Sequence, residues 1–180
     1  MKNLLNLLLL VLFISNLNAQ NNFALLKESK INVEFDYSSA KIESINAKDY
    51  FDDRKYFNTD FELEYKNEVF KEFIGSLYEN IPSSYKIRFV FEDADYKMIV
   101  KIIDVTSKGD TKAEISIFNI KTSETIAKSS FFGRGGVYGS FTNLSGDGIK
   151  RIGRKIANKI INSMPYIPIN KYLQILFNII

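Results

Sequence analysis

Four strand-like runs follow one another between residues 85 and 132, and they constrain the fold more than any other feature. The runs are YKIRFVFE (85–92), YKMIVKIIDV (96–105), KAEISIFNI (112–120) and TIAKSSFF (125–132). The connections EDAD, SKGD and KTSE are short and polar, as antiparallel hairpins require, so a meander of four strands is expected. The run at 96–105 is apolar on both faces, which predicts a strand away from the sheet edge, with Asp104 partly buried at its end.

The rest of the chain supplies one more strand and two helices. Alternation in KINVEFDY (30–37) predicts a strand with one buried face, and the mixed region from Ala40 to Tyr65 predicts a long connection. Apolar residues recur at three and four positions from Glu64 to Ile81, just before Pro82, which predicts an amphipathic helix.

A second helix is predicted after the glycines and before Pro165. Leu144 and Ile149 flank Ser145 in the manner of a hydrophobic staple, which places the helix start there, and Gly153 is suited to a close approach to the sheet. The predicted fold class is therefore α+β: a single sheet with an antiparallel meander of about four strands plus an N-terminal strand, and two helices packed on it.

The chain ends bracket this single domain with two apolar segments. Residues 1–19 have one cation, Lys2, then an apolar run and a polar end closing at Ala19, the pattern of a secretory signal peptide. We therefore expect an exported protein, periplasmic or extracellular, with one domain over 20–164 and no transmembrane helix in the mature chain. The apolar C-terminal tail, 165–180, is too short to span a membrane; it is expected to dock on the domain, with a membrane surface or a partner as the alternative.

Composition excludes several chemistries. The chain has no histidine, which removes the commonest general base and metal ligand, and no cysteine, which removes thiol nucleophiles, zinc thiolate sites and disulfides. Its 15 Phe and 10 Tyr can supply a core without disulfides. Losing Lys2 changes the formal charge from +3 to +2, so nucleic acid is not an expected partner. No cofactor and no enzymatic activity are predicted.

An acidic cluster in KDYFDDRKYFNTD (48–60) is the strongest candidate for carboxylate chemistry. Its members could bind calcium or form the carboxylate pair of a glycoside hydrolase. The spacing is not that of an EF-hand, and interleaved cations would neutralise the cluster, so a solvated loop without metal is favoured. The aspartates are Asp49, Asp52, Asp53 and Asp60, and the interleaved cations are Lys48, Arg54 and Lys55.

The stretch from Phe131 to Ile160 holds seven of the nine glycines and the candidate binding residues. Its G-x-G-G-x-x-G pattern misses both the dinucleotide fingerprint and the Walker motif, so nucleotide binding is not expected. Aromatic and cationic side chains of the loop and the following helix could instead meet a sugar ring, a lipid surface or an anionic group; alternatively, the cations only solvate an outer helix face. The candidate residues are Arg134, Tyr138, Phe141, Lys150, Arg151, Arg154 and Lys155.

Several segments resemble secreted or lipid-anchored envelope proteins of Bacteroidota. They are INVEFDYSSAKI, ADYKMIVKIIDVTSKGD, EISIFNIKTSETIAK and the glycine-rich link to the last helix, together covering roughly 30–163. In shape the chain is distantly similar to the small α+β envelope domains of the curli-export lipoprotein, the penicillin-binding-protein activators and the TolB amino-terminal domain. This resemblance implies assembly or partner binding without catalysis, although the lipobox cysteine of many such proteins is missing here.

The sequence therefore predicts an exported, non-catalytic cell-envelope protein that binds a protein or an anionic glycan. One alternative is a small secreted carboxylate-dependent hydrolase of the glycosidase kind. The other is a membrane-surface protein held by its apolar tail.

Overall fold

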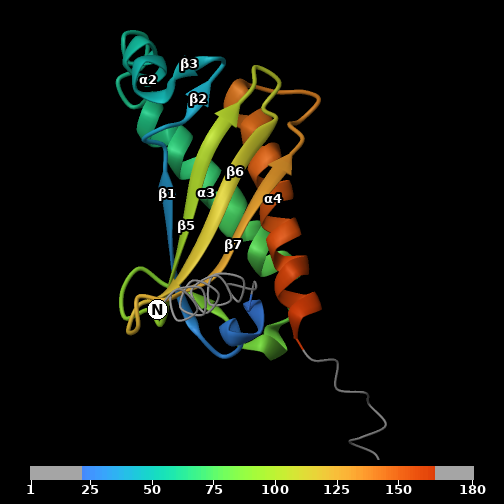
Figure 1. The fold of residues 1–180 in the computed structure, drawn as a ribbon. Helices are drawn as coiled ribbons and strands as arrows, with labels where there is room; N and C mark the ends of the chain where they lie inside the picture. The colour runs from blue at the N-terminus through green and yellow to red at the C-terminus, as the bar shows by residue number, and fades with distance from the viewer. Residues whose placement is uncertain (1–21, 165–180) are drawn as a thin grey trace, which may run out of the picture.

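The computed structural model describes residues 22–164, so the predicted signal peptide and the C-terminal tail lie outside the described residues. The elements follow the order η1, β1, β2, β3, α2, α3, η2, β4, β5, β6, β7 and α4 (Figure 1). Their bounds are η1 Phe23–Leu26, β1 Lys30–Asp36, β2 Lys41–Ile42, β3 Ile45–Asn46, α2 Ala47–Lys55, α3 Phe61–Asn80, η2 Ser83–Tyr85, β4 Arg88–Phe89, β5 Tyr96–Val105, β6 Thr111–Asn119, β7 Thr125–Gly133 and α4 Phe141–Ser163.

One sheet contains all the described strands, with β5 at its centre. On one side β5 pairs antiparallel with β6, and β6 with β7. On the other side its first part pairs in parallel with β1, and its last residues pair in parallel with β2. The strands β4 and β3 continue the sheet beyond β1 and β2. The central place of the 96–105 run and the partial burial of Asp104 are confirmed.

Both long helices, α3 and α4, lie on the same face of the sheet and pack against each other (Figure 1). Every second strand residue points from the sheet toward these helices, because side chains alternate between the two faces of a strand. They include Ile31, Met98, Val100, Ile115 and Ile117, each at most 2% exposed. The predicted α+β fold with one sheet and helices packed on it is confirmed.

The four-strand meander is wrong in its first strand. Only Arg88–Phe89 of the run 85–92 forms a strand, and β4 pairs in parallel with β1. The helix α3 lies between β1 and β4 in the sequence. It brings the chain back to the end of the sheet where β1 begins, as a connection between parallel strands must. Left-handed backbone at Lys86 and Asp93 ends the extended run on either side. The antiparallel meander therefore has three strands, β5 to β7.

The long connection predicted over 40–65 is also wrong, since it contains β2, β3, α2 and the first turn of α3. The helix α2 buries Ala47, Tyr50 and Phe51 at spacings of three and one, while its remaining residues are charged. A nine-residue helix with so narrow an apolar face has a weak periodic signal, and its packing against α3 stabilises it.

The last helix starts one turn earlier than predicted, at Phe141. Its N-cap is Ser140, whose Oγ accepts a hydrogen bond from the Asn143 amide at 3.3 Å. Ser145 is buried inside the helix and donates to the carbonyl oxygens of Phe141 and Thr142. Gly153 permits a close approach to α3, not to the sheet as predicted: a Cβ there would be 3.0 Å from the Phe73 carbonyl oxygen.

Candidate binding cavity

The loop residues predicted to bind a ligand have different surroundings. Arg134 and Tyr138 are exposed, Tyr138 by 88%. Phe141 instead joins the aromatic layer beneath α2 and α3, where its ring stacks on Tyr65 with centroids 5.9 Å apart and planes at 11°. The structure therefore separates Phe141 from the two loop side chains with which it was grouped.

Most of the predicted cations on α4 contact the protein itself. The Arg151 guanidinium donates to the carbonyl oxygens of Arg134 and Gly135 at 2.6 and 2.9 Å, and the Lys155 ammonium donates to that of Phe132 at 2.7 Å. These hydrogen bonds hold α4 against the outer strand β7 and the start of the glycine loop.

The two remaining helix cations differ from each other. The Lys150 ammonium lies 3.6 Å from Glu72 and 3.4 Å from Glu79, both on α3. Arg154 is exposed and makes no hydrogen bond or ion pair within the described part of the chain. Arg134 and Arg154 are thus the predicted cations whose side chains are most available to a ligand.

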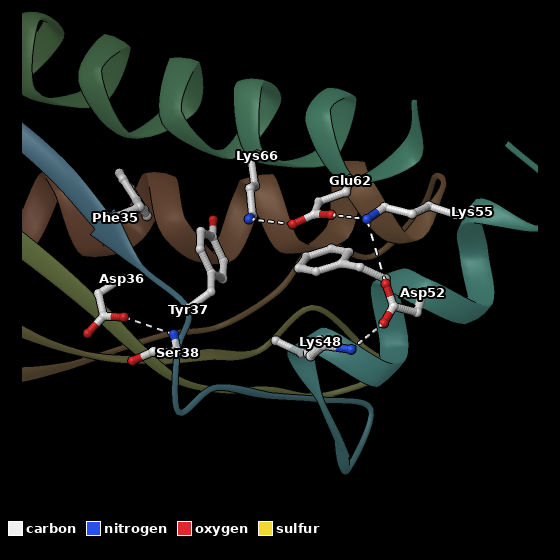
Figure 2. A pocket seen from close by; sticks show the side chains of 11 residues that line it. Phe35, Asp36, Tyr37, Ser38, Lys48, Asp52, Lys55, Glu62 and Lys66 are labelled. Carbon is white, nitrogen blue, oxygen red and sulfur yellow. Dashed lines mark hydrogen bonds and ion pairs between the residues drawn. The ribbon is translucent and has the colours of Figure 1, made fainter. Parts of the chain in front are cut away.

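A cavity of about 590 Å³ opens between the end of β1, α2 and the start of α3 (Figure 2). Aromatic rings form one part of its lining, and charged side chains of α2 and α3 form another. The lining residues are Phe35, Asp36, Tyr37, Ser38, Ala47, Lys48, Phe51, Asp52, Lys55, Glu62 and Lys66.

The aromatic part consists of Phe35 from β1, Tyr37 directly after β1, and Phe51 from α2. The rings of Phe35 and Tyr37 stack with centroids 6.1 Å apart, and the Phe51 ring meets Tyr37 edge-on at 6.2 Å. The Lys66 ammonium lies 5.3 Å from the centroids of both Tyr37 and Phe51, a favourable cation–π arrangement. The sequence places these rings here because β1 ends beside the buried face of α2.

Opposite charges alternate along the rim of the cavity (Figure 2). The Lys66 ammonium is 2.6 Å from Glu62, which is 2.7 Å from the Lys55 ammonium. Lys55 lies 3.6 Å from Asp52, and Asp52 lies 2.7 Å from Lys48. Together with Asp36, the lining contains three lysines and three carboxylates, so it has no net charge.

The three carboxyl groups of the cavity have lowered pKa values. A hydrogen bond from Lys48 lowers the pKa of Asp52, hydrogen bonds from Lys55 and then Lys66 lower that of Glu62, and hydrogen bonding to Ser38 lowers that of Asp36. All three are therefore ionised at neutral pH and accept hydrogen bonds. None is held protonated, as the general acid of a glycosidase must be.

Tyr37 supplies a neutral polar group among the rings. Its hydroxyl is buried without a hydrogen-bond partner among the described residues, and in Figure 2 it points toward α3. Burial raises the Tyr37 pKa well above its usual value, so the hydroxyl keeps its proton. A buried hydroxyl without a partner is uncommon in proteins, and the Tyr50 hydroxyl is a second case among the described residues.

The acidic cluster of the sequence does not converge. Of its four aspartates Asp52 lines the cavity, whereas Asp49, Asp53 and Asp60 are exposed elsewhere on α2 and before α3. Among residues 22–164, no group of three or more acidic, histidine or cysteine side chains could hold a metal ion.

Sequence reasoning missed the cavity because its parts come from three elements separated in the chain. The spacings that could have indicated it are Lys48 with Asp52 and Glu62 with Lys66, both four residues apart. Such pairs support a helix in each segment. They do not show that the two helices meet beside the end of β1.

Within the described residues, no helix has the length and apolar character needed to cross a membrane.

The solved structures similar to this chain include two envelope-related or uncharacterised proteins with low sequence identity. No protein-family model and no curated protein matches the chain. The PelC dodecamer of Paraburkholderia phytofirmans is similar with a TM-score of 0.40 and 9% identity, over 73% of this chain and 90% of PelC. A Xanthomonas campestris protein of family DUF330 has a TM-score of 0.33 and 12% identity, over 44% of this chain and 53% of that protein. Because both TM-scores are low, the resemblance to envelope domains stays a prediction.

Proposed function

We propose that this chain is an exported, non-catalytic cell-envelope protein that binds a glycan, with one sugar ring held in the cavity between β1, α2 and α3. The observation that carries the proposal is the lining, in which aromatic rings lie beside alternating lysines and carboxylates. A volume of about 590 Å³ falls within the usual range of ligand sites, about 300–1,000 Å³.

The chemistry of a sugar matches both parts of this lining. The C–H face of a pyranose is apolar and packs on aromatic rings, here the partly exposed rings of Phe35 and Tyr37. Its hydroxyl groups both donate and accept, so they can bond to Asp52 and Glu62 on one side and to lysine ammonium groups on the other.

The charge balance favours a neutral sugar over an acidic one at this site. Equal numbers of lysines and carboxylates give no net attraction for an anion. An anionic glycan, as the sequence predicted, would have to be held by Arg134 and Arg154, because Arg151 and Lys155 are bonded to the backbone.

The hydrolase alternative requires a carboxyl group with a raised pKa next to a second carboxylate. The cavity carboxyls have lowered pKa values instead, each set by a neighbouring donor. The observation therefore favours binding over hydrolysis at this site. Incubation of the protein with peptidoglycan and analysis of the supernatant tests this directly, since released soluble sugar fragments would contradict a purely binding role.

The experiment for the binding site is co-sedimentation of residues 20–180 with purified peptidoglycan sacculi and with outer-membrane vesicles, at low and high salt. We expect pelleting that persists at high salt and is lost in the double variant Asp52→Asn with Lys66→Gln. The matched control is Arg134→Gln with Arg154→Gln, which changes two exposed cations outside the cavity and should pellet like the wild type.

Other results would indicate a different site or a different class of partner. Salt-sensitive pelleting lost only in the arginine variant would move the site to the basic helix and an anionic glycan. Protein that stays in the supernatant with both materials would overturn glycan binding and leave a protein partner. Circular dichroism of each variant confirms that the loss is not unfolding.

A further inference from the structure

A second, apolar groove lies on the other side of Phe35, between α3 and the strands β1 and β4. Its volume is about 170 Å³. No charged side chain lines it, in contrast to the cavity between β1, α2 and α3. The lining residues are Val33, Phe70, Ile74, Phe89, Val90 and Phe91.

The exposed member of this groove, Phe91, is held in place. Its side chain is 83% exposed, yet its ring stacks on Phe70 with centroids 6.2 Å apart and planes at 22°. The Asn32 side-chain amide donates to the carbonyl oxygens of Val90 and Phe91 at 3.3 and 3.1 Å. Phe91 and the groove together form a continuous apolar surface, which is suited to contact with an apolar segment.

The chain itself contains a segment of matching chemistry. Residues 171–180, KYLQILFNII, have one charged side chain, Lys171, and apolar residues at most other positions. They follow α4, which ends at Ser163, while Met164 packs against the core.

The end of α4 and the start of β4 lie at the same end of the molecule. The helix α4 packs against η1, which Figure 1 places beside its C-terminal end. Just after η1, the Glu28 amide donates to the Tyr85 carbonyl oxygen, and the Arg88 amide donates to that of Ser29. With 171–180 in the groove, residues 165–170 connect them to α4 and extend to about 20 Å at about 3.3 Å each. The groove residues Phe70 and Ile74 lie only about 15 and 9 Å along the axis of α3 from its C-terminal end. The segment is therefore long enough to reach the groove.

We propose that the segment 171–180 docks in the groove between α3 and β4 and covers Phe91. The apolar composition on both sides and the sufficient reach carry this assignment. It is independent of the sugar cavity, whose lining it does not use apart from the shared neighbour Phe35.

The cysteine-free chain allows a direct test on residues 20–180. A spin label on Asn178→Cys should broaden the backbone amide NMR signals of Val33, Ile74 and Phe91. Phe91→Asp should abolish this broadening, because it places a charge in the groove. Ile120→Asp, at an exposed apolar side chain outside the groove, should leave it unchanged.

Two further measurements distinguish docking within one chain from docking into a second copy and from contact with a membrane. Mixing spin-labelled protein with separate ¹⁵N-labelled protein detects docking into a second copy, and broadening seen only there would overturn the assignment within one chain. Deleting 171–180 should lower the urea midpoint of unfolding. An unchanged midpoint together with loss of binding to lipid vesicles would show that the segment contacts a membrane instead.

Discussion

At the scale of single residues, several glycines act in packing as well as in turns. A Cβ on Gly148 of α4 would meet the Gly109 carbonyl oxygen, and one on Gly133 of β7 would meet the Gly148 carbonyl oxygen. The helix can therefore approach β7 and the turn before β6 only because these positions lack side chains. The sequence shows the concentration of glycines but not which of them face another backbone.

The substitution Gly148→Ala tests this close approach. The added methyl group has no space next to the Gly109 carbonyl and the Thr111 hydroxyl, so α4 must shift and the free energy of unfolding should fall by about 1–3 kcal/mol. The control is Gly75→Ala in α3, where nothing lies within 4 Å of the new Cβ. There the better helix propensity of alanine should raise stability by about 0.5–1 kcal/mol. Urea unfolding of both variants measures the two changes. Equal losses of unfolding free energy would contradict the close approach at Gly148.

Glu62 should contribute a pH-dependent part of the stability. Its pKa is lowered from an ordinary value of 4.5 by Lys55 and Lys66. A lowered pKa in the folded state means that this stability is present above the unfolded value and lost as pH falls through the folded value. Glu62→Gln should therefore be less stable than the wild type at neutral pH, with the difference shrinking toward about pH 3. Urea midpoints over this range measure it, with Glu68→Gln on the same helix as control; a constant difference would count against the ion-pair explanation.

At the scale of elements, the cations of α4 protect the outer edge of the sheet. Among the described strands β7 pairs only with β6, and on its other side the Ile126 carbonyl oxygen accepts a hydrogen bond from the Asn22 amide. The Lys155 and Arg151 side chains bond to carbonyl oxygens along this side and just beyond it. Charged side chains at an edge strand also discourage pairing with other chains.

Replacing Arg151 by alanine should cost about 1–2 kcal/mol of unfolding free energy, because it removes two charge-assisted hydrogen bonds. Arg154→Ala, three residues further along the helix, should change stability by less than about 0.5 kcal/mol, since its side chain is exposed. Thermal or urea unfolding checks both. Equal effects would indicate that the cations of α4 only solvate the helix.

Helices and strands with a clear hydrophobic periodicity could be predicted from the sequence. Those that depend on tertiary contacts could not. The strands β5, β6 and β7 and the helix α3 have clear alternation or three-and-four spacing. In β4 only two residues pair, and their partner is β1, more than fifty residues earlier. For the same reason the cavity could not be predicted, because Phe35, Asp52 and Lys66 come from β1, α2 and α3.

At the scale of the whole molecule, one aromatic layer connects the cavity between β1, α2 and α3 with the apolar groove. Phe35 lines the cavity, and its ring lies 6.1 Å from Phe70, which lines the groove, and 5.3 Å from the buried Phe73. The two surfaces therefore share a wall. Phe131 in β7 belongs to the same core, but β5 and β6 separate its strand from β1.

In double-mutant cycles, the losses of unfolding free energy should be non-additive for neighbouring rings and additive for distant ones. Phe35→Ala and Phe70→Ala should be coupled by about 0.5–1.5 kcal/mol, because the two rings touch edge-on. Phe35→Ala and Phe131→Ala should add to within about 0.3–0.5 kcal/mol, since three strand spacings of about 4.8 Å separate β1 from β7. Urea unfolding of the single and double variants gives both coupling energies. If the distant pair were coupled as strongly as the touching pair, the core would respond as one unit, and a ligand in the cavity would be expected to affect the whole sheet and not only the groove beside it.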